Sequence, residues 1–148
     1  MIWYKEYSLE EINKIFDCYM TKLLEIKAIE ITNNSLVCTM PITDNVRQPF
    51  GILHGGASVV LAESIGSIAS YLVINPEKHL AVGLDINANH IRPGKTGTLT
   101  AYCTPIHIGR TTHVWDIKMY NDKKSLVCIS RLTVAIIKNT NQKLTENN

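Results

Sequence analysis

Residues 55–72 read GGASVVLAESIGSIASYL, and this stretch decides the fold. A helix built from it carries small or apolar side chains on every face, which is typical of a buried helix. We therefore predict a helix from Gly55 to about Leu72 in the core of the protein. Its only charged residue is Glu63. Because a carboxylate is rarely buried without a partner or a chemical role, Glu63 is the first candidate for a functional residue.

Strand-like segments flank this helix on both sides. In Thr96–Ile108 and Thr111–Tyr120 the side chains alternate between apolar and polar, the period of a strand with one buried face. Strands joined by turns favour an antiparallel sheet, so the sequence predicts an α+β fold with the long helix against that sheet. The predicted strands are Leu23–Thr32, Ser35–Ile42, Leu80–His90, Thr96–Ile108, Thr111–Tyr120 and Leu126–Ile137.

The first 35 residues and the C-terminal segment carry simple local signals. Ser8 followed by Glu11 is a capping-box pattern, and the apolar spacing from Leu9 to Tyr19 predicts a helix after it. The pair Asn33-Asn34 tolerates positive φ and predicts a hairpin turn between the first two strands. Residues 138–148 are polar and are expected to be frayed.

The composition limits the possible functions. The chain has 148 residues, the size of one domain, and its 15 basic and 13 acidic residues give a net charge of +2. Since there is no Lys/Arg block, we expect neither nucleic acid nor a membrane surface as a partner. The apolar stretch 57–74 is interrupted by polar residues and the N-terminus does not resemble a signal peptide. The scattered cysteines, without CxxC or metal-ligand spacing, predict reduced thiols in a cytoplasmic protein; they are Cys18, Cys38, Cys103 and Cys128.

The sequence His54-Gly55-Gly56 opens the long helix. The free N–H groups and the positive dipole end of a helix start can stabilise an oxyanion, although a glycine-rich helix entry is also common in other settings. Gly55 and Glu63 stand eight positions apart, which is about 12 Å along a helix. One substrate carbonyl reaches both only if the helices of two subunits run antiparallel across a two-fold axis, so the spacing predicts a dimer with shared sites. The competing interpretation is that Glu63 pairs with an Arg or Lys of a neighbouring strand.

Two longer stretches resemble a known family. The segments RQPFGILHGGASVVLAESIGS (Arg47–Ser67) and VGLDINANHIRPG (Val82–Gly94) are similar to hotdog-fold thioesterases of the 4-hydroxybenzoyl-CoA thioesterase type. Within that superfamily they resemble the bacterial branch that hydrolyses 1,4-dihydroxy-2-naphthoyl-CoA or proofreads misacylated carrier protein in enterobactin synthesis. The resemblance covers nearly the whole chain, and it implies one hotdog domain over residues 1–148.

The resemblance also implies roles for particular residues. Glu63 matches the carboxylate that attacks the thioester or activates water, and Gly55 matches the N–H that polarises its carbonyl. Gln48 and His54 match residues that orient the carbonyl, the water or the leaving group. Ser67 matches a hydroxyl that positions the water.

Substrate-binding residues follow from the same resemblance. Val82 and Gly83 match the strand that lines the pocket for pantetheine and acyl group, where Gly83 would leave space for a ring. His90 either contacts the substrate or sits between strands. The candidates for the phosphates of coenzyme A are Arg92, His107, Arg110 and Thr111.

The family comparison implies an acyl-CoA substrate with an aromatic acyl group, and a carrier-protein thioester stays open as the alternative substrate. It implies no metal and no cofactor apart from the coenzyme A of the substrate. Family members are dimers that pair into tetramers. Two other functions stay open at this point: a hotdog hydratase or dehydratase, which would act on crotonyl-CoA without releasing thiol, and a non-catalytic acyl-CoA-binding module.

Overall fold

The structure, a computed structural model, describes residues 1–140, so the predicted frayed tail lies outside it apart from its first three residues. Lys138, the first of these, still belongs to the last strand. The elements in chain order are α1 (Leu9–Phe16), α2 (Tyr19–Leu23), β1 (Lys27–Ile31), β2 (Leu36–Pro41), a 3₁₀ turn (Asp44–Val46), α3 (Gly55–Val73), β3 (His79–His90), β4 (Thr98–Ile108), β5 (Thr112–Tyr120) and β6 (Leu126–Lys138).

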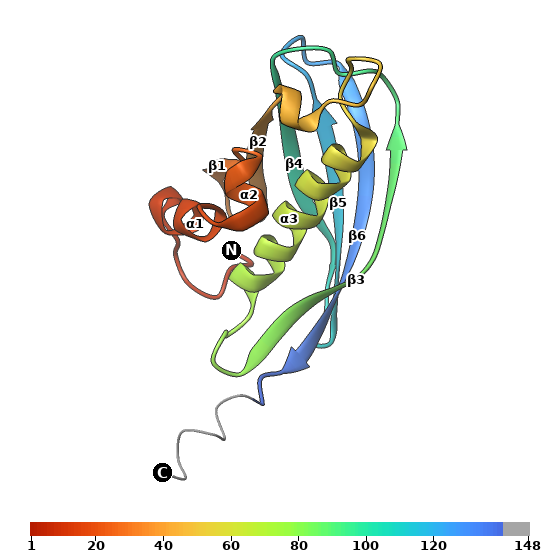
Figure 1. The fold of residues 1–148 in the computed structure, drawn as a ribbon. Coiled ribbons are helices and arrows are strands. Elements are labelled where there is room, and N and C mark those ends of the chain that lie inside the picture. The colour runs from red at the N-terminus through yellow and green to blue at the C-terminus, as the bar shows by residue number, and fades with distance from the viewer. Residues whose placement is uncertain (141–148) are drawn as a thin grey trace.

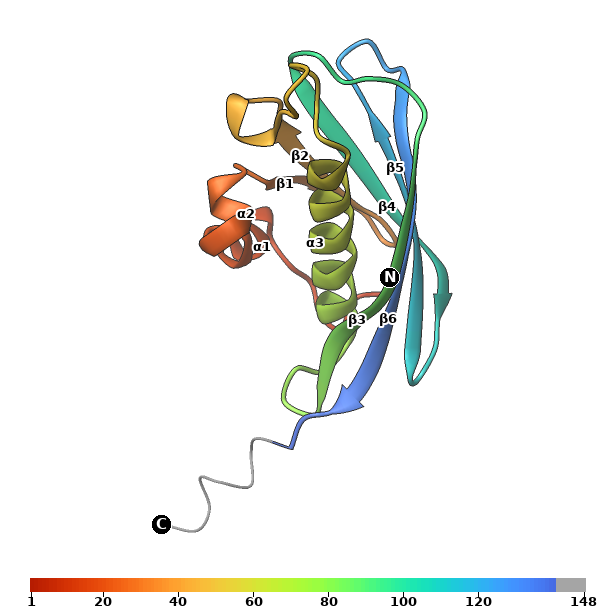
Figure 2. The same ribbon diagram turned by 45° about the vertical axis from the view of Figure 1, so that its right-hand side comes forward.

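The six strands form one antiparallel sheet in the order β1-β2-β4-β5-β6-β3. Figure 1 shows α3 lying across one face of this sheet, with α1 and α2 beside it near β1 and β2. In the turned view of Figure 2 the sheet curves around α3. The predicted α+β architecture with one long helix against an antiparallel sheet is confirmed.

The side of α3 that faces the sheet forms the core. Leu61, Ile65 and Leu72 are fully buried there, against sheet residues such as Ile117 and Leu132. By length and composition this helix could cross a membrane, but in the structure it is the core helix against the sheet.

The expectation that α3 is buried on every face is wrong for the single chain. Val60, Glu63 and Ser67 are only half-buried, and Tyr71 is 39% exposed. The reason is geometric: one sheet covers one side of a helix, and α1 and α2 do not cover the rest. We call the strip of α3 that carries Val60, Glu63, Ser67 and Tyr71 its open face.

Two local predictions near the N-terminus need correction. The first helix, α1, already ends at Phe16, and Tyr19 begins a separate short helix, α2. Leu23, the predicted start of the first strand, is the last residue of α2, and β1 begins only at Lys27. Backbone φ values of 45° at Tyr19 and 55° at Glu25 turn the chain at both ends of α2. The hairpin between β1 and β2 is confirmed. Its Asn33-Asn34 pair does not use positive φ. Instead, the Thr32 hydroxyl accepts the N–H groups of Asn34 and Ser35 and holds the turn.

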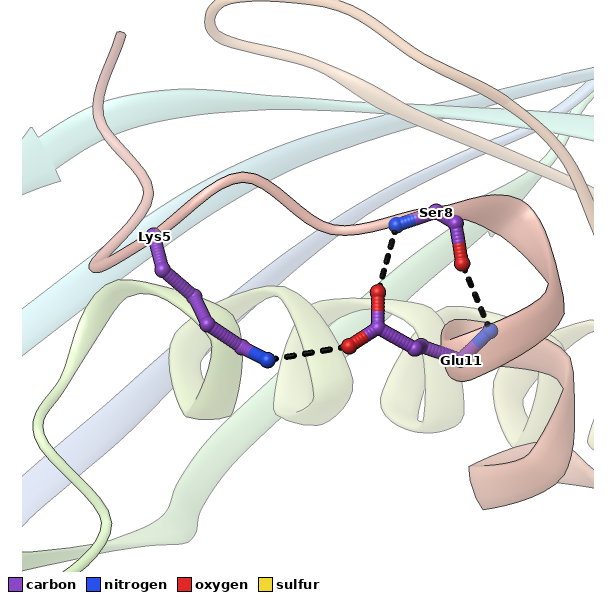
Figure 3. Close-up of polar contacts among 3 residues, drawn as sticks. All are labelled: Lys5, Ser8 and Glu11. Atoms are coloured by element: carbon purple, nitrogen blue, oxygen red, sulfur yellow. Dashed lines mark hydrogen bonds and ion pairs between the residues drawn. The ribbon is translucent and has the colours of Figure 1, made fainter.

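The capping box at α1 forms as predicted (Figure 3). The Glu11 N–H donates to Ser8 Oγ at 3.2 Å, and the Ser8 N–H donates to Glu11 Oε2 at 2.8 Å. Lys5 Nζ lies 2.9 Å from the other Glu11 oxygen. The Ser8 N–H, followed by Lys5 and the Ser8 hydroxyl, lowers the pKa of Glu11 to about 2.

The N-terminal segment is attached to the core by an indole pair. Trp3 and Trp115 stack with ring centroids 6.4 Å apart and planes 8° from parallel. The Trp115 Nε1–H donates to Ser70 Oγ of α3 at 2.7 Å, which satisfies both buried polar groups. The Tyr4 N–H donates to the Leu72 carbonyl at 2.8 Å, so residues 1–7 are tied to the end of α3.

All four cysteines are free thiols, as the sequence predicted. Cys38, Cys103 and Cys128 are buried, and burial raises the pKa of each of these thiols, because a low-dielectric environment disfavours the thiolate. Cys18, the N-cap residue of α2, is exposed.

Candidate active site

Glu63 lies on the open face of α3 and carries the only charge of that helix. The Ser67 hydroxyl, one turn later, donates to Glu63 Oε1 at 3.3 Å. Within residues 1–140 no Lys, Arg or His forms an ion pair with Glu63. The counter-ion that the competing interpretation required is therefore missing from this part of the chain.

The carboxylate of Glu63 rests on the backbone of Gly83 in β3. A Cβ added to Gly83 would overlap Glu63 Oε1 and would lie 3.3 Å from the carboxyl carbon. The space above Gly83, expected to be open for a ring, is thus filled by the carboxylate in this chain. The neighbouring Val82 is 46% exposed on the outer edge strand.

His54 begins α3 as its N-cap residue. Its Nδ1 accepts the Gly56 N–H at 2.8 Å, and its carbonyl accepts the Ala57 N–H at 3.0 Å. Since Nδ1 is an acceptor here, the ring proton of the neutral imidazole lies on Nε2. The Gly55 N–H has no acceptor within residues 1–140, so this helix start presents one free backbone donor.

A cleft of about 390 Å³ opens beside this helix start. Gln48, Gly55, His90 and Arg92 all line it. The His90 ring packs against Gly55, where an added Cβ would meet Nε2 at 2.7 Å, so His90 lies in the cleft and is exposed. Its backbone also pairs with Cys128 of β6, so His90 belongs to the sheet and lines the cleft at the same time.

The loop before α3 is braced by a residue that the sequence analysis did not single out. Arg47 donates through Nη1 to the carbonyls of Gly51 and Lys95, and its Nε lies 3.2 Å from Asp44. Inside the loop, Gln48 Oε1 accepts the Phe50 N–H at 2.6 Å. This bond leaves the amide NH₂ of Gln48 as its available donor. No sequence signal separates such a bracing arginine from an ordinary surface one.

The remaining candidates lie at the turn between β4 and β5. His107, Arg110 and Thr111 are all exposed there. Thr112 pairs with Ala135 of β6, and Ala135 pairs with Val82, so this turn lies at the Val82 end of the sheet.

The candidate residues therefore form two groups in one chain. The helix-start group consists of Gln48, His54, Gly55, His90 and Arg92. The mid-helix group consists of Glu63, Ser67, Val82 and Gly83, with His107, Arg110 and Thr111 at the nearby turn. Gly55 and Glu63 are about 12 Å apart along α3, so a single chain does not bring the two groups together. A larger depression, of about 510 Å³ between α1, α2 and β1, contains none of these residues.

Chemically, the two groups supply complementary parts of an acyl-transfer site. One offers a carboxylate without a counter-ion, and the other offers a backbone donor for an oxyanion. The sequence profile of the family described as "Thioesterase superfamily" matches residues 50–128, more than half of the chain and all of these candidate residues except Gln48. This chain belongs to the thioesterase superfamily.

Relatives in this superfamily are similar over almost the full length. The chain is 46% identical over 137 residues to the 1,4-dihydroxy-2-naphthoyl-CoA hydrolase of Escherichia coli, covering 93% of this chain and 100% of the relative. It is 38% identical to the proofreading thioesterase of Cronobacter sakazakii, with 93% and 99% covered. The resemblance to this branch of the superfamily, stated from the sequence, is confirmed.

Solved structures of thioesterases agree with the fold. A glutamine-to-alanine variant of a Pseudomonas aeruginosa thioesterase superposes with a TM-score of 0.92 at 44% identity, covering 94% of this chain and 100% of that one. A Staphylococcus aureus thioesterase gives 0.78 at 44% identity, with 80% and 98% covered. The chain is thus a hotdog-fold thioester hydrolase.

Proposed function

We propose that this thioesterase hydrolyses aromatic acyl-CoA at sites shared by two subunits, with Glu63 as the nucleophile or general base. The observation that carries the proposal is the state of Glu63: a lone charge on the core helix, half-buried, held by Ser67 and free of any ion pair within residues 1–140. A carboxylate without a counter-ion keeps its lone pairs available for a carbonyl carbon or for the proton of a water.

The other half of the chemistry comes from the helix start. The Gly55 N–H has no acceptor in residues 1–140 and sits at the positive end of the α3 dipole. A thioester carbonyl placed there would have its developing oxyanion stabilised by this donor. The Gln48 NH₂ and His54 Nε2–H, both left free by the local hydrogen bonds, are the additional donors that orient the carbonyl or the leaving thiolate.

A homodimer joins the two halves. If two α3 helices lie antiparallel with their open faces together, Gly55 of each chain lies beside Glu63 of its partner. The same arrangement buries the half-exposed apolar residues of that face, such as Val60, and removes the free edge of β3 from solvent. It also brings Arg92 of one subunit toward the turn of its partner that carries Arg110, so that both cations can bind the phosphates of one coenzyme A. Pairing of two such dimers into a tetramer is part of the proposal.

Two features of the relatives support these assignments. The S. aureus thioesterase was crystallised with a glutamine or a glutamate replaced by alanine, and these two positions have the same spacing as Gln48 and Glu63. The E. coli relative is a hydrolase of a naphthoyl thioester, which supports an aromatic acyl group here. The free cysteine thiols support a reducing, cytoplasmic location.

The test is an assay of thiol release with benzoyl-, hydroxybenzoyl-, dihydroxynaphthoyl-, phenylacetyl- and straight-chain acyl-CoA. We expect Glu63→Gln to lower kcat by about 10²–10⁴-fold, because an amide neither attacks nor accepts the proton. Glu77→Gln, which changes an exposed carboxylate after the same helix, is the control and should retain wild-type turnover. Near-normal activity of Glu63→Gln would refute the assignment, and turnover confined to carrier-protein thioesters would refute the choice of coenzyme A.

A further inference from the structure

We infer that Gly83 is a positioning residue. Because it has no side chain, the Glu63 carboxylate can pack against its backbone, with one oxygen fixed and the other free to react. This inference rests on the proposed function, since it takes Glu63 as the reacting group. It replaces the role that the sequence suggested for Gly83, which was to leave space for the substrate.

The contacts of the carboxylate carry the inference. Glu63 Oε1 lies between the Ser67 hydroxyl, 3.3 Å away, and the backbone of Gly83, where a Cβ would overlap it. Glu63 Oε2 lies 3.8 Å from that Cβ position and has no hydrogen-bond partner within residues 1–140. The two oxygens are therefore unequal: Oε1 is restrained on two sides, and Oε2 remains available for the thioester or the water.

The backbone under the carboxylate is itself fixed. Gly83 pairs with Val134 of β6, a fully buried residue, so the edge strand is anchored at this point. The register then shifts between Gly83 and Asp85, which makes Leu84 the extra residue of a β-bulge. Bulges bend a strand and redirect its side chains, and they are enriched beside active sites. Here the bulge begins at the residue that supports the carboxylate.

A methyl group at position 83 tests the inference with little risk to the fold. The atoms in its way are at the flexible end of the Glu63 side chain, so the carboxylate moves and the backbone stays. A displacement of about 1 Å in a catalytic group can reduce the rate about 10²-fold without weakening substrate binding. We expect Gly83→Ala to lower kcat by about 10- to 100-fold for aromatic and short-chain acyl-CoA alike, with KM changed less than about threefold.

The control is a second background, the Glu63→Asp variant. Its carboxylate is on a side chain one methylene shorter and withdraws from Gly83, so adding Gly83→Ala to Glu63→Asp should change kcat by less than about twofold. This comparison also stands if Gly83→Ala alone were to fold poorly, because the double variant has room for the methyl. Asn87→Ala, an exposed site on the same strand, should leave kcat unchanged, and circular dichroism confirms that each variant is folded.

Three results would overturn the inference. One is a wild-type kcat for Gly83→Ala, and another is an equal loss from Gly83→Ala in the wild-type and Glu63→Asp backgrounds. The third is a rise in KM that grows with the size of the acyl group, which would show that Gly83 makes space for substrate. Failure of the proposed function is distinguishable, since Glu63→Gln would then stay active whatever Gly83→Ala does.

Discussion

The imidazole of His54 caps α3 and, under the proposed function, also orients the substrate, and these two tasks are separable. Its Nδ1 caps α3 through the Gly56 N–H, and its Nε2–H remains as a free donor. An asparagine can perform the first task because it is among the best N-cap residues, but it lacks the reach of the second.

We therefore predict that His54→Asn keeps the thermal midpoint of the wild type and lowers kcat by about 10- to 100-fold, whereas His54→Ala lowers both. Loss of the cap should cost about 1 kcal/mol, a decrease of roughly 3 °C in the midpoint for a chain of this length. Thiol-release kinetics and thermal melts of the two variants provide the comparison. Full activity of His54→Asn would reduce His54 to a capping residue.

The chemistry of single residues was only partly visible in the sequence. Glu63 was conspicuous because it is the one charge in an apolar helix, and the sequence alone supplied that contrast. The cap made by His54 depends on a side-chain rotamer, which no spacing rule reports. Gly83 was expected, from the resemblance, to leave space for a ring, and the carboxylate that fills this space could only be identified once β3 and α3 were placed.

At the scale of elements, prediction succeeded where the segment with a periodic pattern was long and failed where it was short. The bounds of α3 and β4 were predicted to within two residues, because many alternating or helical positions agree on each. The helix α2 spans Tyr19–Leu23, and Cys18 provides no side-chain cap for it. It depends on a positive φ at Tyr19, which a residue with a Cβ adopts only when its surroundings enforce it.

The start of α1 gives a pH prediction. The pKa of Glu11 is lowered from its ordinary value of 4.5 to about 2 in the folded protein, first by the Ser8 N–H. A lowered folded pKa means that the stabilisation is complete above pH 4.5 and is lost as the pH falls through about 2. We expect Glu11→Gln to lower the thermal midpoint by about 2 °C at pH 7, and the difference from wild type to shrink as the pH falls from 4.5 to about 2.

The matched control is Glu10→Gln. Glu10 lies in the same helical turn and forms an ion pair with Lys14 at 2.8 Å, but it makes no capping-box bond. Melting curves followed by circular dichroism between pH 2 and pH 7 would separate the two. A Glu11→Gln difference that persists unchanged at pH 2 would contradict the assignment of the stabilisation to the carboxylate.

At the scale of the whole molecule, the proposed site between two subunits predicts complementation between two inactive variants. Glu63→Ala removes the carboxylate, and Gly55→Pro removes the backbone donor. Proline is tolerated at the first position of a helix, and His54 already has the extended φ and ψ of −69° and 129° that a following proline requires. Each homodimer should be inactive, but a mixed dimer contains one intact site.

Equal amounts of the two variants, unfolded and refolded together, should recover about a quarter of the wild-type activity, because half of the dimers are mixed and each has one of two sites. Gly55→Ala controls for crowding of His90, since it adds a Cβ and keeps the N–H. A mixture of Glu63→Ala with Glu63→Gln should stay inactive. No recovery in the first mixture would contradict a site shared between two subunits.

The stacked indoles have an optical consequence. The chain contains two tryptophans, and both belong to the Trp3–Trp115 pair. All of its indole fluorescence therefore comes from two buried chromophores, close enough to couple electronically. One of them sits on the N-terminal segment and the other hydrogen-bonds to α3. Release of residues 1–7 would expose Trp3 to water, shift the emission to longer wavelength and abolish the coupled signal, so the protein carries its own reporter of N-terminal docking.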